Sequence, residues 1–306
     1  MKLPDIASDR PELSLAGALD WVGMRGIEVP IFLLDQEGHL YRTAARASTF
    51  VSLENQDSRG IHMSRLFKDL QAELGRSPLD FPLMAGVLDQ FLSSHEGLSQ
   101  KAKLEVEFQA LAERKALKSD NKGWRTYPVK MSASLQKAKE PRFYLETLVT
   151  YSSTCPASAA LSRHLIQENF KNHFRGQDLD FKDVYDFLGT THGIIATPHA
   201  QRSQARVKVE INPTDGFNFD QLIGLVEEAL QTPVQTLVKR EDEQEFALRN
   251  GQNLMFCEDA ARRVQAIFMQ EPSILDFIAQ MSHLESLHPH DAVSVVSRGL
   301  ELHSFE

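Results

Sequence analysis

Cysteine is scarce in this sequence of 306 residues, which contains only Cys155 and Cys257. Two thiols far apart in the chain cannot form the dense disulfide framework of a small secreted protein. We therefore expect the protein to work in a reducing compartment, the cytoplasm, with both thiols free.

Long apolar runs are absent as well. No segment approaches the ~18 consecutive apolar residues of a membrane span. The first twelve residues contain acids and prolines where a signal peptide needs an uninterrupted apolar stretch. We therefore expect neither a membrane span nor a signal peptide.

Positive charge is in deficit. The chain has 33 Lys and Arg residues against 42 Asp and Glu residues, which gives a formal net charge of −9. An acidic surface repels polyanions, so we expect neither nucleic acid nor an anionic membrane as a general partner. A small anionic ligand is compatible with this charge, because a local group of cations and backbone N–H groups can bind a phosphate.

Apolar residues are numerous enough for two folded modules. They make up 42% of the chain, and single cores rarely grow beyond about 250–300 residues. Residues 1–20 carry two prolines and little periodicity, which predicts an N-terminal arm. In residues 21–138, the apolar patterns predict the order strand, strand, helix, helix, strand, strand, over 29–34, 43–53, 63–74, 84–92, 104–108 and 129–135.

The same order recurs in residues 139–306. An additional pair of helices is predicted at about 158–198, as an insertion after the first strand of this half, and a charged loop is predicted between the two later helices. The predicted fold class is therefore α+β, with two tandem ββααββ modules. Antiparallel sheets of this kind lose their free edges when they close into a barrel across subunits, so we expect an oligomer. The predicted strands and helices are 143–154, 205–211, 219–230, 261–268, 275–281 and 293–296.

Cys155 lies where a predicted strand ends and a predicted helix begins, with Pro156 at the first helical position. A helix N-terminus favours a thiolate, which attacks electrophiles and binds metals. The competing interpretation is a small buried hydrophobic residue, which is the usual role of an isolated cysteine. Cys257 lies in a helical pattern beside Phe256 and is predicted to be core packing.

Eleven histidines are present, and three of their placements matter. His288 and His290 alternate in a turn between the last two predicted strands, so their imidazoles can face one ligand, although a solvated turn explains the spacing equally well. His199 directly precedes a predicted strand, and an exposed loop residue is its simpler interpretation. His62 begins a predicted helix and is equally well explained as a helix N-cap.

Two acidic segments complete the set of candidates. Glu243 ends the charged run of residues 239–243, and Glu258 lies in the first turn of a predicted helix. Solvated surface acids explain both. A carboxylate also joins Cys and His around metals, and it accepts the N–H donors of a guanine edge. Gly-rich phosphate loops, Cys-x-x-Cys pairs and Gly-x-Ser-x-Gly motifs are absent, so these residues leave the chemistry open.

Six short motifs nevertheless follow one another along the chain. They are Gly60-Ile61-His62-Met63-Ser64-Arg65, Cys155-Pro156-Ala157-Ser158, His199-Ala200-Gln201-Arg202-Ser203, Lys239-Arg240-Glu241-Asp242-Glu243, Phe256-Cys257-Glu258-Asp259 and Glu285-Ser286-Leu287-His288-Pro289-His290-Asp291-Ala292. Each is weak alone, but in this order they resemble the prokaryotic GTP cyclohydrolase IB family, also called type IV. The resemblance covers nearly the whole chain, from about Trp21 to the last predicted strand.

The resemblance implies a tunnelling fold, assembled as a homotetramer with active sites between subunits. It also implies the conversion of GTP and water to 7,8-dihydroneopterin 3′-triphosphate and formate, the first step toward folate-type pterins. A divalent metal ion is implied as cofactor, with zinc, manganese and iron as the alternatives. The hypothesis is thus metal-assisted hydrolysis at C8 of guanine.

The same resemblance assigns roles to residues motif by motif. Cys155 looks like the active-site cysteine and metal ligand of the family, with His199 and Glu243 as the other ligands. His288 and His290 look like the catalytic histidines that position water or move protons. Glu258 is similar to the glutamate that anchors guanine. The implied triphosphate contacts, which a flexible polyanion needs in number, are Arg65, Arg202 and Lys239.

Two features depart from the family pattern. Many members read Cys-Pro-Cys-Ser where this chain has Ala157, so a second thiol has no counterpart here. The separation of Cys155 and His199 is longer than in short members, because of the predicted insertion. The assignment of His199 therefore depends on the strand after the insertion keeping its place.

Two other functions stay open. One is an NADPH-dependent nitrile reductase of the tunnelling fold, in which an active-site cysteine forms a thioimide. The other is a purine- or pterin-binding protein without catalysis, a hypothesis that the departure at Ala157 motivates. Release of formate from GTP distinguishes the cyclohydrolase from both.

Overall fold

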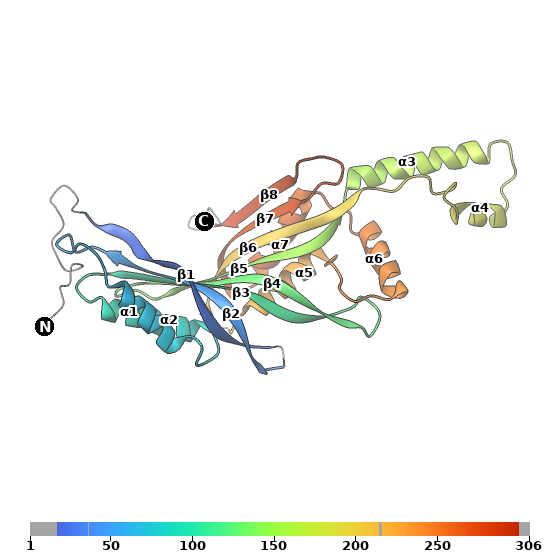
Figure 1. The fold of residues 1–306 in the computed structure, drawn as a ribbon. Coiled ribbons are helices and arrows are strands. Elements are labelled where there is room, and N and C mark those ends of the chain that lie inside the picture. Colours follow the sequence, from blue (N-terminus) through green and yellow to red (C-terminus); the bar gives the residue numbers. More distant parts are fainter. Residues whose placement is uncertain (1–16, 36, 214–215, 300–306) are drawn as a thin grey trace.

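The computed structural model describes residues 17–35, 37–213 and 216–299, which form one antiparallel sheet and the helices around it (Figure 1). Eight strands are hydrogen-bonded in the order of the sequence, so neighbours in the sheet are also consecutive strands of the chain. They are β1 (Leu19–Leu34), β2 (Leu40–Leu53), β3 (Lys101–Lys115), β4 (Lys122–Gln136), β5 (Arg142–Thr154), β6 (Ala200–Ile211), β7 (Ile274–His283) and β8 (Ala292–Arg298).

Alternation along the strands places apolar side chains on one face of the sheet, and helices cover that face. α1 (Met63–Glu73) and α2 (Phe81–Ser94) lie between β2 and β3 in the chain, whereas α5 (Phe219–Leu230) and α7 (Cys257–Gln270) lie between β6 and β7. The buried residues of these helices and of the strands form one continuous hydrophobic cluster. The α+β class and the predicted order of strands and helices are confirmed except for one additional helix between β6 and β7, while the division into modules 21–138 and 139–306 stays a prediction.

β1 begins at Leu19, well before the predicted strand at residues 29–34. Its register with β2 shifts twice, and Gly26, beside the second shift, has a φ of 72°. A bulge breaks the period of two in the side chains, and glycine adopts a positive φ without strain. Residues 19 and 20 of the predicted N-terminal arm therefore belong to the sheet, and residues 1–16 lie outside the described residues.

A further helix, α6 (Arg240–Gln252), stands where the sequence predicts a charged loop, so that prediction is wrong. Its one buried side chain is Asp242. The Asp242 carboxylate accepts the N–H groups of Lys118 and Ser119 at 2.8 Å each, the Ser119 hydroxyl at 2.6 Å and the Lys239 N–H at 2.8 Å. Although burial opposes the charge, these hydrogen bonds hold the pKa of Asp242 well below its usual range. These hydrogen bonds hold α6 against the β3–β4 hairpin, although α6 has no apolar face.

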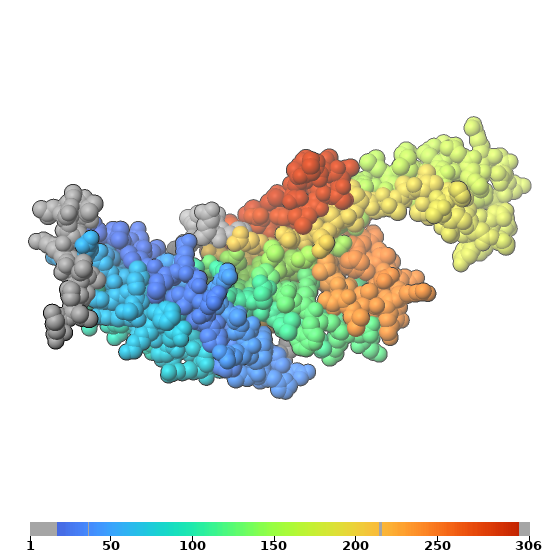
Figure 2. All heavy atoms as spheres, in the orientation of Figure 1, coloured from blue at the N-terminus to red at the C-terminus, as the bar shows by residue number. Residues whose placement is uncertain are grey.

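The predicted insertion forms an arm that stands out from the body of the molecule (Figures 1 and 2). Its helices are α3 (Pro156–His173), which starts slightly earlier than predicted, and α4 (Phe181–Leu188). Two aromatic side chains of the arm are largely exposed, Phe181 at 84% and Tyr185 at 69%. Exposed apolar surface of this kind is typical of a face that an assembly covers. The rings at the tip, which pack with centroids 4.5–6.1 Å apart, are Phe170, His173, Phe174 and Phe187.

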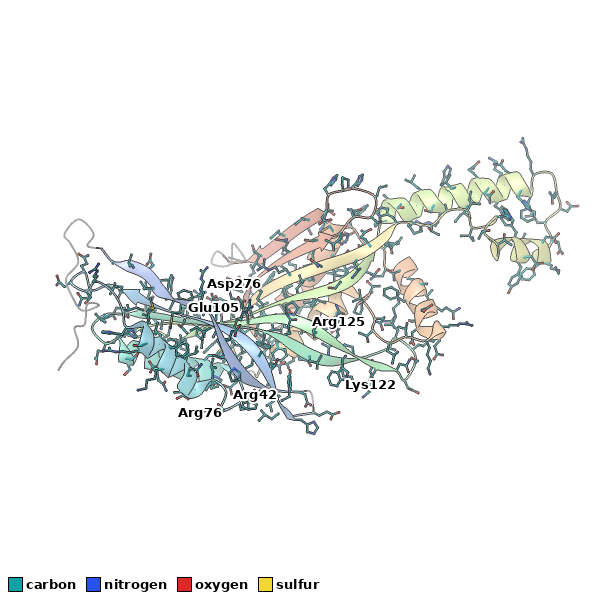
Figure 3. All side chains as sticks on the ribbon, in the orientation of Figure 1. Arg42, Arg76, Glu105, Lys122, Arg125 and Asp276 are labelled. Carbon is teal, nitrogen blue, oxygen red and sulfur yellow. The ribbon has the colours of Figure 1, made fainter. Side chains whose placement is uncertain are left out.

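The opposite face of the sheet is polar and hollowed. The hollow has a volume of about 1210 Å³ and is lined by β1 to β6. Charged side chains of this face pair with one another: Glu105, labelled in Figure 3, contacts Lys103 at 2.6 Å and Lys130 at 2.9 Å. β1 and β8 form the two free edges. Within the described ranges, no helix combines the length and the apolar character needed to cross a membrane.

Candidate active site

The apolar face of the sheet becomes polar at one end. There β5, β6 and β7 carry polar side chains at every second position, in line with the buried apolar residues of the same strands. Pairing of Ser153 with Gln201, and of Ser203 with His283, aligns these rows. We call this set the polar end: Tyr151, Ser153, Cys155, His199, Gln201, Ser203, His283 and Glu285.

Cys155 joins β5 to α3, as the sequence predicts. It is the N-cap residue of α3, where its thiol accepts the Ser158 N–H at 3.5 Å and Pro156 occupies the first turn. Its own N–H donates to the His199 carbonyl at 3.3 Å. The side chain is only partly buried. The thiol is therefore held by a strand and a helix and is still reachable from solvent.

His199 lies where the arm returns to the sheet. Thr154 pairs with Ala200, so the arm leaves and rejoins the sheet at adjacent positions and the strand after it keeps its place. The His199 N–H donates to Ser158 Oγ at 3.1 Å. Cys155 and His199 are therefore neighbours across β5 and β6, although the whole arm separates them in sequence.

Two side chains hold the ring of His199. Its Nδ1 lies 3.0 Å from Gln201 Oε1 and 3.8 Å from Glu285 Oε2. The Gln201 amide nitrogen in turn donates to Ser153 Oγ at 3.0 Å and to Glu285 Oε1 at 3.5 Å. The imidazole is thus oriented through one of its nitrogens, and the other is left for a ligand.

A neutral, buried layer supports these residues. His283 Nε2 and Tyr151 Oη share a hydrogen bond of 3.0 Å, and the Oγ atoms of Ser153 and Ser203 lie 2.7 Å apart. Burial lowers the pKa of His283 to about 4 and raises that of Tyr151 well above its usual value. Both rings are therefore uncharged at pH 7, and this layer adds no charge to the polar end.

α6 packs against the end of β5 beside the polar end. Asn250 Oδ1 accepts the Ser152 hydroxyl at 2.6 Å and the Thr154 hydroxyl at 3.4 Å. Glu243 precedes Asn250 by two helical turns and so lies on the same face of α6. Its side chain is exposed. The helix therefore presents Glu243 on the side that contacts β5. Ser152 and Thr154 alternate with Ser153, however, so this contact is made on the face of β5 opposite to the polar end.

The first turn of α7 is tied to the last two strands. The Cys257 thiol lies 3.3 Å from the Met281 carbonyl and 3.2 Å from Ser294 Oγ, and burial raises its pKa. Its predicted packing role is confirmed. The next residue, Glu258, is exposed and lies in the first turn of α7, as predicted. The Met255 N–H donates to the Thr154 carbonyl at 3.2 Å, so the start of α7 lies beside the end of β5.

His288 and His290 lie in the loop between β7 and β8, where the sequence places them. Their rings stack with centroids 5.0 Å apart and planes inclined by 9°, and both side chains are exposed. Glu285, near the start of this loop, contacts Gln201. The loop therefore begins at the polar end, and the two imidazoles face the same way.

The three predicted triphosphate contacts do not converge in one chain. Arg65 belongs to α1 in the other half of the sheet and donates to the Ser94 carbonyl at 2.6 Å. Arg202 alternates with Gln201 and so lies on the opposite face of β6. Lys239 is the exposed N-cap residue of α6. The triphosphate contacts of Arg65, Arg202 and Lys239 therefore stay predictions. His62 stands at the N-cap position of α1, but its side chain makes no capping hydrogen bond.

The polar end holds fewer metal ligands than the sequence predicts. In the part of the chain that the structure describes, no three His, Cys, Asp or Glu side chains lie close enough together to hold a metal ion. Cys155 and His199 form a pair, and Glu243 lies on the neighbouring helix. The proposed set of three is therefore not assembled within this single chain.

Several site residues carry no role in the sequence interpretation. Gln201, Ser203 and Glu285 occur there only as positions within the quoted motifs, and Ser153 and His283 are not singled out. One signal was available, because the period-two pattern of buried residues continues through these polar positions to the strand ends. Buried polar residues in such a row are typical of a hydrogen-bonded site.

The similarity of this chain to known proteins extends over almost its full length. The model of the family described as "Type I GTP cyclohydrolase folE2" matches residues 3–294. The GTP cyclohydrolase FolE2 of Bdellovibrio bacteriovorus is 54% identical over 304 residues, covering 99% of this chain and 98% of that protein. The FolE2 protein of Hydrogenovibrio crunogenus is 47% identical over 298 residues, with 97% and 95% coverage.

Similarity in structure alone is more distant. The uricase from Arthrobacter globiformis aligns with a TM-score of 0.49 and 8% identity, over 94% of this chain and 96% of that chain. A likeness at this level carries no information on function. The family match and the long alignments to FolE2 proteins agree with the ordered motifs and with the pair of Cys155 and His199 at the polar end. The chain therefore belongs to the FolE2 family, the GTP cyclohydrolase IB family.

Proposed function

We propose that the protein converts GTP and water to 7,8-dihydroneopterin 3′-triphosphate and formate, the first step toward folate-type pterins. Its membership of the FolE2 family supports this activity. The structural observation that carries it is the meeting of Cys155 and His199 across β5 and β6, with Glu258 on the adjacent turn of α7. A thiol, an imidazole and a carboxylate thus lie at one end of the sheet.

A divalent metal ion suits the two ligands that the polar end offers. Cys155 offers a thiolate and His199 an imidazole nitrogen, which are both ligand types of zinc. The contact of Nδ1 with Gln201 leaves Nε2 of His199 for the ion. Glu243, on the face of α6 that contacts β5, is the third proposed ligand. A metal ion held there would supply Lewis acidity, which lowers the pKa of bound water.

Glu258 is proposed to bind the base. Its carboxylate accepts two hydrogen bonds, and the edge of guanine presents the N1–H and N2–H donors side by side. A carboxylate at this place selects guanine over adenine, whose edge lacks this pair of donors. Binding of the edge to Glu258 leaves the imidazole ring of the base, with C8, free to face Cys155.

His288 and His290 are proposed to move protons. Water adds to C8, the C8–N9 bond breaks, and N9 takes a proton from an imidazole. A second water cleaves the formyl group and releases formate. The ribose then rearranges and the new ring closes with loss of one water, so one water is consumed overall. Ala157 has no thiol, so no covalent step passes through that position.

The first test is turnover of GTP by the purified protein with manganese or zinc. We expect equal amounts of formate and of a pterin that becomes fluorescent after oxidation. Formate is measured with a coupled dehydrogenase and the pterin by fluorescence. Oxidation of NADPH without a metal requirement would indicate a nitrile reductase. Binding of GTP without formate would indicate a protein that has no catalytic activity.

Assembly into a homotetramer is also proposed. Both sheet edges carry exposed apolar side chains, among them Trp21 on β1 and Val293 and Val295 on β8. Free edges of this kind invite pairing with another chain, and closure into a barrel removes them. Pairing of β8 with β1 of the next copy places residues of two chains around each polar end. In such an assembly, Arg65 is proposed to serve a site in a neighbouring copy.

Sedimentation of the purified protein tests this assembly. We expect a mass four times the 34.5 kDa of one chain. Replacing Val293 and Val295 together with lysine adds charge to the edge strand, so we expect dissociation and loss of turnover. The matched control is Met269→Lys, since Met269 is equally exposed but lies on the helix α7 and not on an edge strand. A native protein that sediments as one chain would contradict the proposal.

A further inference from the structure

The orientation of the Gln201 side-chain amide is determined by its neighbours. A carboxylate accepts hydrogen bonds and donates none, so the amide group that faces Glu285 Oε1 at 3.5 Å is the NH₂ group. The same nitrogen donates to Ser153 Oγ at 3.0 Å. Ser153 Oγ also lies 2.7 Å from Ser203 Oγ, in a hydrogen bond that either hydroxyl can donate. Gln201 is only 8% exposed, so solvent does not compete for these bonds.

The orientation of the amide decides which nitrogen of His199 carries the proton. With the NH₂ group of Gln201 turned to Glu285 and Ser153, its oxygen faces His199 Nδ1 at 3.0 Å. An amide oxygen accepts a hydrogen bond, so Nδ1 is the protonated nitrogen of the neutral ring. Nε2 then carries the lone pair. Glu285 Oε2, at 3.8 Å from Nδ1, supports the same arrangement.

We infer that Gln201, oriented by Glu285, is a positioning residue that holds His199 in the Nδ1–H form and so presents Nε2 to a ligand of the site. The inference rests on the proposed role of His199 as a metal ligand and extends it to residues to which no role is assigned. Partners of this kind around a ligating histidine set its ring orientation and strengthen its binding to the metal.

The test compares the tautomer of His199 with the affinity of the protein for zinc. The metal-free protein, labelled with ¹⁵N-histidine, is studied by NMR at pH 8, and the His199 signals are assigned by their loss in His199→Asn. We expect the native ring to be protonated at Nδ1. In Gln201→Leu we expect the Nε2–H form to gain population and the Zn²⁺ affinity to fall about 10- to 100-fold.

Two further variants make the test decisive. Glu285→Gln keeps the shape of the side chain but adds a donor, so the amide of Gln201 is no longer forced into one orientation and we expect a mixture of tautomers. The matched control is Gln204→Leu, which changes the same residue type on the opposite face of β6. We expect it to leave both the tautomer and the Zn²⁺ affinity unchanged.

The outcomes separate this inference from the proposed function. Native tautomer and native Zn²⁺ affinity in Gln201→Leu would overturn the positioning role, whatever the activity of the protein. Failure of the native protein to release formate from GTP would overturn the proposed function. The NMR measurement uses neither GTP nor metal, so it decides the tautomer in either case.

Discussion

Replacing Cys155 with serine is expected to lower the rate of formate release from GTP at least about a thousandfold, while leaving the fold intact. Serine is a good N-cap residue, so α3 keeps the bond from the Ser158 N–H that the thiol accepts in the native protein. What the variant loses is the thiolate, a strong nucleophile and a soft metal ligand that a hydroxyl does not replace at neutral pH. Single-turnover measurement of formate gives the rate.

Cys155→Ala and Cys257→Ser serve as the comparisons. Cys155→Ala removes both the thiol and the cap, so we expect the same loss of turnover and a small additional loss of thermal stability. Cys257→Ser changes the only other thiol of the chain and retains a group that can bond to the Met281 carbonyl, so we expect turnover to persist. Turnover by Cys155→Ser at a tenth of the native rate or more would contradict the role of Cys155.

The two thiols differ in exposure, so their reactivity toward an alkylating reagent can be compared. Cys155 is partly exposed, whereas Cys257 is buried and burial raises its pKa. Iodoacetamide reacts with thiolates that solvent can reach. We therefore expect alkylation of Cys155 alone in the folded protein, with loss of turnover in proportion, as mass spectrometry of the peptides would show.

The order of the elements could be predicted because its signals are local. Apolar residues at alternate positions mark most of the strands from β2 to β8, aromatic and β-branched residues mark β5, and apolar residues at helical spacing mark α1, α2, α5 and α7. α6 escaped prediction because its stability comes from Asp242, which accepts hydrogen bonds from the distant β3–β4 hairpin. The first half of β1 escaped because bulges near Gly26 interrupt the alternation. Tertiary contacts and irregular backbone leave no periodic signal.

The site could be predicted only in part, for a related reason. The motifs indicated Cys155 and His199, but only the register of β5 with β6 shows that the arm returns to the position from which it leaves. The role of Gln201 depends on which of its two amide groups faces Glu285, and that is a property of the folded network. The residue types of the motifs indicated the chemistry of the site, whereas the register of β5 with β6 determines which of its side chains contact one another.

Replacing Glu258 with glutamine is expected to weaken the use of GTP about 10- to 100-fold, mainly through KM, because it removes one of the two acceptors that we propose for the guanine edge. A glutamine side chain keeps one acceptor and turns a donor toward an N–H donor of the base. The change also removes a negative charge from the first turn of α7, so the result needs a comparison that isolates recognition of the base.

Inosine triphosphate provides that comparison, because its base lacks the 2-amino group. The native protein is expected to prefer GTP over inosine triphosphate in kcat/KM, and Glu258→Gln to lose most of that preference. Asp259→Asn removes the same charge from the same helical turn, but its carboxylate accepts the Phe256 N–H at 3.0 Å and caps α7. We expect Asp259→Asn to be less stable with an unchanged preference. An unchanged preference in Glu258→Gln would place the guanine edge elsewhere, because recognition by Glu258 requires the 2-amino donor.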